Sequence, residues 1–375
     1  MMTRLEFDKS FYLNPKMQPL GGTSLTNLLR LLAWNRFSVD WRFIPRLLYV
    51  SLLVTIFSPL RIYEKIKFDK KIKEAEIPQI ICIVGHFRSG TTILQYLMGQ
   101  DRNLSFVSTR ETMTPWIILS FDKLLDNIVD QHLPDKRPMD DLEMRSRLPY
   151  EDEYAIANLS PYSFYHGWYF PKNIYHYFRR YVLFDGVDND TKERWKEIYR
   201  YLLKKIAYKY GGKPILLKSL VNTARIKLLL ETFPNIKFIH IYRNPYHVYL
   251  STWRLYNSII PIFSLQMVDR EFLDKFIIDF YKELYKRYLR EKESVDENNL
   301  VEIRYEDFVK SPVKTLKEVY DKLGLGWFED AKPYFERFLS KYKDYKPHRY
   351  EIDEETRRKI GKEWDFAFKA FGYEK

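Results

Sequence analysis

Residues 79–99 carry the clearest chemical signal in the chain. A short apolar run over residues 80–84 precedes a turn bounded by Gly85 and Gly90, and apolar residues at helical spacing follow. A strand, a glycine-bounded turn and a helix in this order direct several backbone N–H groups and a helix N-terminus at one point. An anionic phosphate or sulfate group is the favoured occupant of such a turn.

The turn differs at one decisive position from a nucleoside-triphosphate loop. Gly85 and Gly90 have the spacing of such a loop, but Thr91 stands where the loop carries its phosphate-binding lysine. The turn contains Arg88 instead. We therefore expect no ATPase, and predict a site for a 5′-phosphate that bears a different group.

Charged or hydroxyl-bearing side chains also follow the other predicted strands. They are Arg88, Glu111, Lys218, Arg243 and Tyr305, which lie at or after strands predicted over residues 80–84, 104–108, 214–218, 236–242 and 300–304. Ligands of open α/β sheets bind outside the carboxyl ends of the strands. We therefore predict that these groups serve a common ligand site.

The repeated order of short buried strand, polar residue and helix predicts an α/β fold. We expect a parallel doubly wound sheet of the nucleotide-loop type flanked by helices. With 375 residues, 46% of them apolar, the chain is long enough for a large core. The predicted organisation is a helical extension over residues 1–74 followed by one domain over residues 75–375.

A second anion site is expected around Arg243. Ser251 lies eight residues further on, about two helical turns along the following helix. A guanidinium and a hydroxyl can together grip phosphate oxygens. The alternatives are that Arg243 belongs to an ordinary helix start and that Lys218 is a solvated lysine at a strand end.

The segment Arg88-Ser89-Gly90-Thr91-Thr92 resembles the 5′-phosphosulfate loop of the sulfotransferase family, whose donor is 3′-phosphoadenosine-5′-phosphosulfate. The spacing from Arg243 to Ser251 resembles the 3′-phosphate motif of the same family. The resemblance runs from about residue 78 to the C-terminus. It implies that the donor is bound by Arg88, Ser89, Gly90, Thr91, Thr92, Arg243, Ser251 and Tyr305.

The resemblance also implies catalytic roles. Lys218, with Arg88 beside it, corresponds to the family's cation at the bridging oxygen of the leaving group. Glu111 resembles the general base of a glutamate-using bacterial branch, and the acidic cluster Glu151 to Glu153 competes for that role. The alternative for Glu111 is a salt bridge with Arg110 or Arg88.

Charge and cysteine content limit the partners. The net charge of +12 favours an anionic partner, and its even distribution along the chain favours a membrane surface or a polyanionic nucleotide over nucleic acid. The single cysteine, Cys82, lies in a predicted buried strand, so no disulfide framework is expected. The seven histidines show no ligand pair at helical spacing, and we predict no metal. These features indicate a cytoplasmic protein.

Residues 43–60 are strongly apolar, are interrupted by Pro45 and closed by Pro59, and are followed by basic residues. The run falls short of the roughly 20 apolar residues of a bilayer span. An interfacial helix with basic flanks can be shorter than a span, and its basic residues are attracted to anionic lipid headgroups. We expect peripheral association with the inner face of a membrane, and hence a lipid-like acceptor. A helix packed on the core or on a partner subunit, and a true span, are the alternatives.

The leading prediction is therefore a sulfotransferase that acts on a hydroxyl or amine. A nucleotide kinase or NTPase is one alternative, and would require Mg²⁺. The other is a non-catalytic nucleotide-binding protein associated with a membrane.

Overall fold

A computed structural model describes residues 18–137, 142–341 and 351–375. The chain forms two compact units. The helical unit comprises residues 1–78, 107–212 and 255–273, and the sheet unit comprises residues 79–106, 213–254 and 274–375. The boundary predicted near residue 75, between an extension and one domain, stays a prediction.

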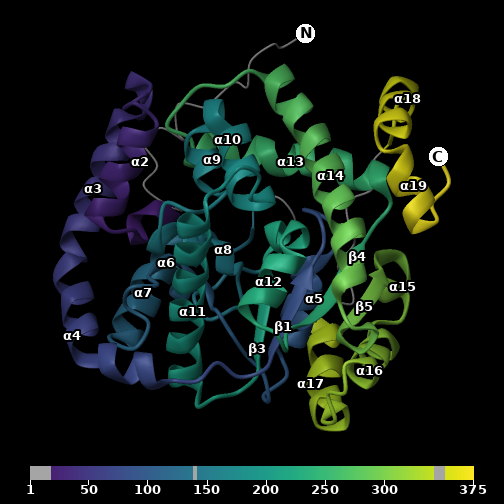
Figure 1. Ribbon diagram of the computed structural model, residues 1–375, viewed down its shortest axis with the longest axis horizontal. Helices are drawn as coiled ribbons and strands as arrows, with labels where there is room; N and C mark the ends of the chain where they lie inside the picture. The colour runs from purple at the N-terminus through teal and green to yellow at the C-terminus, as the bar shows by residue number, and fades with distance from the viewer. Residues whose placement is uncertain (1–17, 138–141, 342–350) are drawn as a thin grey trace. The chain divides into compact units, whose positions relative to one another are not determined.

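The sheet unit is built on a five-stranded sheet in the order β2-β3-β1-β4-β5 (Figure 1). The strands are β1 (Ile80–Val84), β2 (Ser105–Phe106), β3 (Ile215–Lys218), β4 (Lys237–Tyr242) and β5 (Leu300–Arg304). All four pairings between neighbouring strands are parallel. The predicted α/β fold with a parallel doubly wound sheet is confirmed.

The strand order places a topological switch point at the end of β1. This strand is buried along its whole length and pairs with β3 on one side and β4 on the other. The chain runs from β1 to the β2 edge, returns through β3 and then crosses to β4. The direction of winding reverses beside β1, and this is where such sheets bind their ligands.

Helices connect the strands of the sheet unit and complete its core. They are α5 (Thr91–Met98), α12 (Ile226–Thr232), α15 (Tyr305–Lys310), α16 (Pro312–Lys322), α17 (Phe328–Lys341), α18 (Glu354–Glu363) and α19 (Asp365–Phe371). Two long helices, α13 (Pro245–Phe263) and α14 (Arg270–Glu291), are divided between the units. The ring of Trp364 stacks on Tyr281 of α14 with centroids 3.7 Å apart, so α14 shares an aromatic core with the C-terminal segment.

The helical unit contains the remaining helices (Figure 1). They are α2 (Leu25–Trp34), α3 (Ile44–Ile56), α4 (Ser58–Glu74), α6 (Thr109–Met113), α7 (Asp122–His132), α8 (Asp152–Leu159), α9 (His166–Tyr169), α10 (Ile174–Phe178) and α11 (Asn189–Tyr210). Pro59 lies just after α3, which ends at Ile56, and this fits the expected close of the apolar segment. It occupies the first turn of α4, where proline is compatible with a helix because its missing N–H needs no partner there.

A buried ion pair fixes α4 within the helical unit. Lys205 of α11 lies 2.7 Å from a carboxylate oxygen of Glu64, and both side chains are almost wholly shielded from solvent. The backbone N–H groups of Ile118 and Leu119 donate to the same carboxylate at 2.8 and 3.0 Å. Helix α4 thus packs on elements that lie more than 40 residues away in the sequence.

Candidate active site

The turn after β1 requires its two glycines. Gly85 and Gly90 have φ values of +151° and +102°. A Cβ atom on Gly85 would lie 2.4 Å from the carbonyl oxygen of Ile241, and one on Gly90 would lie 2.4 Å from the ring of Tyr305. Arg88, between them, also has a left-handed backbone with φ of +68°. The turn therefore has the tight, glycine-dependent form of an anion-binding loop.

A side chain that the sequence did not single out fastens the start of this turn. The hydroxyl of Thr223 accepts a hydrogen bond from the Gly85 N–H at 2.8 Å and donates to the Gly85 carbonyl at 2.9 Å. Within the turn, the Ser89 hydroxyl donates to the carbonyl of His86 at 2.8 Å. Ser89, predicted to bind the donor, thus has a hydrogen bond that shapes the loop.

Helix α5 begins with Thr91 directly after Gly90. The first N–H groups of a helix have no partner inside it, so those of Thr91 and Thr92 are suited to an anion. The ammonium group of Lys218, the last residue of β3, lies 3.4 Å from the Thr92 hydroxyl. Lys218 is only 1% exposed, so it is not the solvated strand-end lysine of the alternative interpretation.

Arg88 connects the two predicted anion motifs. Its Nε donates to the hydroxyl of Ser251 at 2.8 Å, and its carbonyl oxygen accepts from Nη1 of Arg243 at 3.3 Å. The residues predicted separately from the glycine turn and from the segment after β4 therefore meet within the sheet unit. This contact lies at the carboxyl end of β1, where the strand order reverses.

Arg243 is held by an aromatic ring and keeps one donor unused. Its guanidinium carbon lies 4.3 Å from the centroid of the Tyr305 ring. Its buried Nε has no hydrogen-bond partner among the described residues. Burial raises the pKa of the Tyr305 hydroxyl, while the charges of Arg243 and Arg88 oppose that rise. A buried, unpaired guanidinium donor is expected to find its partner in a ligand.

His86 lies in the turn but does not titrate near neutral pH. Burial lowers its pKa to about 3, and its backbone hydrogen bond with Phe87 only partly opposes this. The imidazole packs against aromatic rings of α14, among them Tyr281 at 4.9 Å between centroids. His86 is therefore a neutral core residue.

Glu111 lies in the helical unit, in α6. It forms a capping box with Ser108, whose N–H donates to Oε2 at 2.8 Å. Its other oxygen, Oε1, lies 2.8 Å from the ammonium of Lys209, accepts from the Tyr210 hydroxyl at 2.9 Å and lies 3.5 Å from Arg110. Both oxygens thus have partners, and the predicted alternative of an ion pair with Arg110 is present in the structure.

The acidic cluster Glu151 to Glu153 is also buried in the helical unit. Asp152 accepts a hydrogen bond of 2.5 Å from the Tyr199 hydroxyl. Burial raises the pKa of Asp152 to about 6, with the charges of Glu153 and Glu151 adding to the rise and the bond from Tyr199 opposing it. Glu153 accepts from the Ser163 hydroxyl at 2.7 Å, and Glu151 from the Tyr165 hydroxyl. The raised pKa of Asp152 is suited to proton transfer near neutral pH.

Among the described residues, no group of three or more His, Cys, Asp or Glu side chains is arranged to hold a metal ion.

Comparisons with known proteins agree with this arrangement. A family model described as the sulfotransferase family matches residues 78–330. Over 362 residues, the chain is 32% identical to omega-hydroxy-beta-dihydromenaquinone-9 sulfotransferase Stf3 of Mycobacterium bovis, covering 94% of this chain and 91% of that protein. The Stf3 protein of Mycobacterium tuberculosis gives the same values.

Two solved structures share the fold. Sulfotransferase STF9 from Mycobacterium avium superimposes with a TM-score of 0.68 at 16% identity, covering 94% of this chain and 97% of that one. Sulfotransferase STF1 from Mycobacterium tuberculosis H37Rv gives a TM-score of 0.64 at 14% identity, covering 96% and 100% of the two chains. On the family match and the identity with Stf3, the chain belongs to the sulfotransferase family and is an enzyme that transfers a sulfuryl group from a sulfate donor.

Proposed function

We propose that the donor is 3′-phosphoadenosine-5′-phosphosulfate and that it binds at the carboxyl end of β1. The contact of Arg88 with both Ser251 and Arg243 is the observation that supports this most, because it joins two anion sites. The glycine turn and the first turn of α5, with Thr91 and Thr92, would receive the 5′-phosphosulfate. Arg243 and Ser251 would receive the 3′-phosphate.

In the proposed reaction, the acceptor oxygen attacks the sulfur atom and forms the new S–O bond. The bond from sulfur to the 5′-phosphate oxygen breaks, and adenosine 3′,5′-bisphosphate leaves with the bonding electrons. Negative charge grows on the bridging oxygen as this happens. Lys218 and Arg88 are proposed to stabilise that charge, since Arg88 belongs to the loop and the ammonium of Lys218 contacts the first turn of α5.

The acceptor hydroxyl gives its proton to a carboxylate. We propose Glu111 for this role. Its contacts with Lys209 and Tyr210 orient the carboxylate. One of these contacts must break so that the carboxylate oxygen of Glu111 can accept the proton. Asp152 is the second candidate, and its raised pKa of about 6 is the observation in its favour.

We propose a lipid-like alcohol as the acceptor. The name of the Mycobacterium Stf3 relatives describes a sulfotransferase for an omega-hydroxylated dihydromenaquinone. The helical unit supports an acceptor of this class, because large apolar side chains of α3 face outward. Ile44, Leu48, Leu52 and Ile56 follow one another at intervals of four residues and are each between 46% and 65% exposed.

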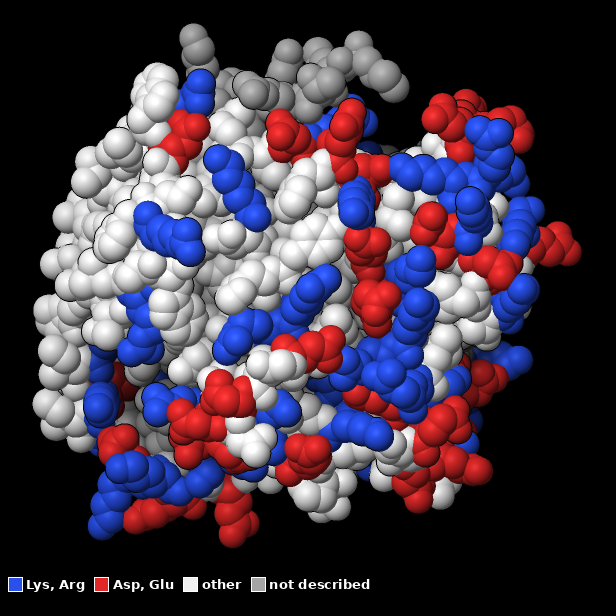
Figure 2. All heavy atoms as spheres, turned by 45° about the horizontal axis from the view of Figure 1, so that its top comes forward, with Lys and Arg blue, Asp and Glu red and all other residues white. Residues whose placement is uncertain are grey.

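This exposed row is part of a larger apolar face on the first helices. Figure 2 shows a broad surface with few charges on the left of the molecule, where α2 and α3 lie. The apolar face comprises Leu25, Leu29, Trp34, Phe37, Trp41, Ile44, Leu48, Leu52, Ile56, Ile62 and Ile66. Exposed cations accompany it, namely Arg30, Arg36, Arg42, Lys65, Lys67, Lys70, Lys71 and Lys73.

We propose that this face rests on the cytoplasmic surface of an anionic membrane. By length and composition, residues 41–74 could also cross a membrane, with a mean hydropathy of 1.7 in the most apolar window. The buried Glu64 in α4 favours the interfacial arrangement, because its ion pair with Lys205 holds α4 against the helical unit. Basic side chains beside an apolar face are attracted to anionic headgroups.

The function is tested by incubating the purified chain with ³⁵S-labelled donor, a membrane lipid extract and a chelator. We expect label in the lipid fraction, and loss of that label in Lys218→Ala. Label that appears only in water-soluble acceptors would contradict the lipid-like class. No label with any acceptor class would contradict the proposed donor.

The membrane role has a separate test. The double variant Leu48→Glu, Leu52→Glu is expected to lose flotation with vesicles that contain phosphatidylglycerol. Leu124→Glu, at an exposed leucine of α7 outside this face, is the matched control and should float as the unaltered protein does. Equal flotation of all three proteins would remove the role given to α3.

A further inference from the structure

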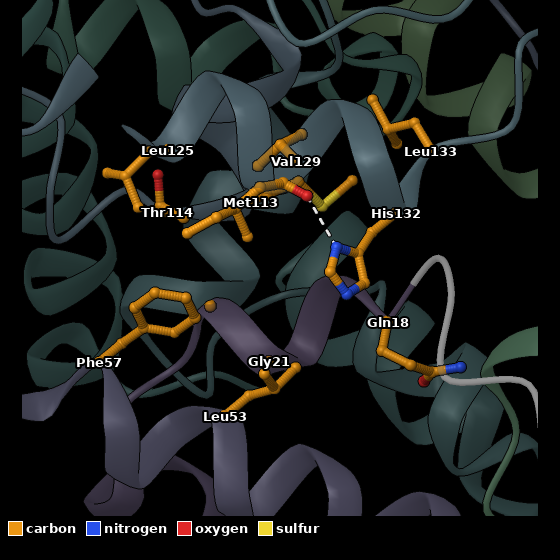
Figure 3. Close-up of a pocket in the computed structure, with 12 residues that line it drawn as sticks. Gln18, Gly21, Leu53, Phe57, Met113, Thr114, Leu125, Val129, His132 and Leu133 are labelled. Carbon is orange, nitrogen blue, oxygen red and sulfur yellow. Dashed lines mark hydrogen bonds between the residues drawn. The ribbon is translucent and has the colours of Figure 1, made fainter. Parts of the chain in front are cut away.

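The helical unit contains an open pocket between α3 and α7 (Figure 3). Its walls are formed by Gln18, Gly21, Gly22, Leu53, Phe57, Met113, Thr114, Leu125, Ile128, Val129, His132 and Leu133. In Figure 3, Leu53 and Phe57 face Met113, Leu125 and Val129 across the pocket.

The walls are suited to hydrocarbon and not to an anion. None of the residues that form them is Lys, Arg, Asp or Glu. Two polar groups of the walls have partners in the protein: His132 Nδ1 lies 2.7 Å from the Ile128 carbonyl, and the Thr114 hydroxyl donates to the Arg110 carbonyl at 2.9 Å. The buried Oε1 of Gln18 has no hydrogen-bond partner among the described residues. A ligand therefore meets mainly apolar side chains, and the nucleotide donor is not a candidate occupant.

The pocket shares α3 with the exposed apolar face. Leu53 and Phe57 form one wall, and their sequence neighbours Leu52 and Ile56 are 56% and 58% exposed. Leu53, Phe57 and Ile128 are themselves partly exposed, so the pocket is accessible from outside. The same helix therefore carries residues of the proposed membrane face and residues of the pocket wall.

The opposite wall leads to α6. Met113 is the last residue of this helix, and Glu111, the proposed base, is two residues earlier. A chain bound against Met113 and Thr114 therefore lies beside the helix that carries Glu111. The pocket thus connects the membrane-facing helix with the helix of the proposed base, both within the helical unit.

We infer that this pocket binds the hydrocarbon chain of the amphiphilic acceptor. The inference rests on the proposed lipid-like acceptor and adds the site that selects its chain. A long acceptor gains from burying apolar surface against Leu53, Phe57 and Val129, whereas a short alcohol with the same reacting group does not reach these contacts.

The test compares two tryptophan substitutions on α7. Ile128→Trp places a large ring in the pocket, and Leu124→Trp, four residues earlier and outside the pocket, is the matched control. The probes are tritiated farnesol and prenol, which carry the same allylic alcohol on a long and a short chain. Equilibrium dialysis without donor measures binding, so this result does not depend on catalysis.

We expect Ile128→Trp to weaken farnesol binding about tenfold or more and Leu124→Trp to change it less than twofold. Leu53→Trp fills the pocket from the opposite wall and should weaken farnesol binding in the same way, which guards against a folding defect in one variant. Unchanged binding of adenosine 3′,5′-bisphosphate and an unchanged unfolding temperature confirm that a variant is folded. Equal farnesol affinity in all folded variants overturns the inference.

A turnover measurement separates this inference from the proposed function. If farnesol is sulfated, the KM for farnesol should rise in Ile128→Trp while the KM for prenol and for the donor stays constant. If farnesol binds in the pocket but is not sulfated, the binding site stands and the proposed acceptor class fails. If farnesol is sulfated with the same KM in every variant, the acceptor class stands and the pocket assignment fails.

Discussion

Arg88 combines two structural tasks in the donor loop. Its left-handed backbone turns the chain between Gly85 and Gly90, and its carbonyl oxygen accepts a hydrogen bond from Arg243. Its side chain reaches Ser251. One residue therefore sets the shape of the loop and its connection to the second anion site. For this reason Arg88 is a poor choice for separating binding from catalysis, and Lys218 and Arg243 are better ones.

Lys218→Ala and Arg243→Ala are expected to affect different kinetic parameters. Loss of Lys218 should lower kcat by a factor of roughly 10²–10³ with only a small effect on donor affinity, because charge on the bridging oxygen develops in the transition state. Loss of Arg243 should weaken binding of adenosine 3′,5′-bisphosphate by a factor of about 10–100, because a charge-assisted phosphate contact is removed. Steady-state kinetics and calorimetry measure the two effects. Equal losses of both parameters in both variants would contradict the assigned roles.

The choice of base is decided by comparing two isosteric substitutions. If Glu111 takes the proton, Glu111→Gln should lower kcat by a factor of roughly 10²–10⁴, whereas Asp152→Asn should leave it within a few-fold. Because Glu111 also pairs with Lys209, binding of adenosine 3′,5′-bisphosphate serves as the control for folding. The reverse pattern, with the pH profile of the unaltered enzyme rising near pH 6, would assign the role to Asp152.

The raised pKa of Asp152 also predicts how the free energy of unfolding depends on pH. Its pKa is raised to about 6 in the folded protein from its usual 3.8, so the folded state holds this proton more tightly than the unfolded state does. The free energy of unfolding should therefore fall as the pH rises from about 4 to about 6, by about 3 kcal/mol from this group. Asp152→Asn should remove that part of the pH dependence. Denaturant unfolding at several pH values provides the measurement, and an identical pH dependence in both proteins would contradict it.

The sequence predicted where the strands end but not which contacts hold the side chains beside those ends. Lys218, Arg243 and Tyr305 were found because a short apolar run ending in a polar residue is visible in the sequence alone. Thr223 has no such signal, since its hydroxyl meets Gly85 only after β3 and β1 have paired. The hydrogen bond of Ser89 inside the loop likewise depends on the fold of the turn.

At the scale of elements, the buried pair of Glu64 and Lys205 joins α4 to α11. Glu64→Gln should lower the free energy of unfolding by about 3–5 kcal/mol, because the ammonium of Lys205 stays buried but no longer has a negative charge beside it. Glu74→Gln on the same helix is the matched control. Glu74 is exposed and lies 4.0 Å from Lys70, so its loss should change stability by less than about 0.5 kcal/mol.

Thermal or denaturant unfolding of these two variants gives the comparison. Equal stability of Glu64→Gln and Glu74→Gln would mean that the buried pair does not hold α4 in place. Sequence patterns do not indicate this pair, because its partners are about 140 residues apart. The sequence did predict a strongly apolar segment that closes at Pro59 and is followed by basic residues, and α3 ends at Ile56, just before that proline.

At the scale of the whole molecule, the fold class was predictable from the sequence. Strand-turn-helix patterns lie within short windows of sequence, and they correctly indicated a parallel sheet. The two compact units each draw on separate stretches of chain, and long-range packing alone decides that grouping.

The cationic side chains of the sheet unit predict how the enzyme responds to metal removal and to salt. Because Arg88, Lys218 and Arg243 are proposed to neutralise the donor, sulfuryl transfer should continue at its full rate in excess EDTA. Adenosine 3′,5′-bisphosphate should raise the unfolding temperature, and added salt should reduce this shift. The measurements are a rate assay and thermal unfolding at several salt concentrations. A rate that falls with EDTA and returns with Mg²⁺ would contradict the proposed chemistry.

The exposed apolar face of α2 and α3 has a practical consequence for handling the protein. In dilute buffer the hydration of these apolar side chains costs free energy. Two molecules can lower that cost when their apolar faces pack against each other. Concentrated stocks should therefore cluster reversibly, more strongly in sulfate salts and less so with a mild non-ionic detergent. Apparent activity per molecule will then depend on how the sample is prepared, even when every active site is intact.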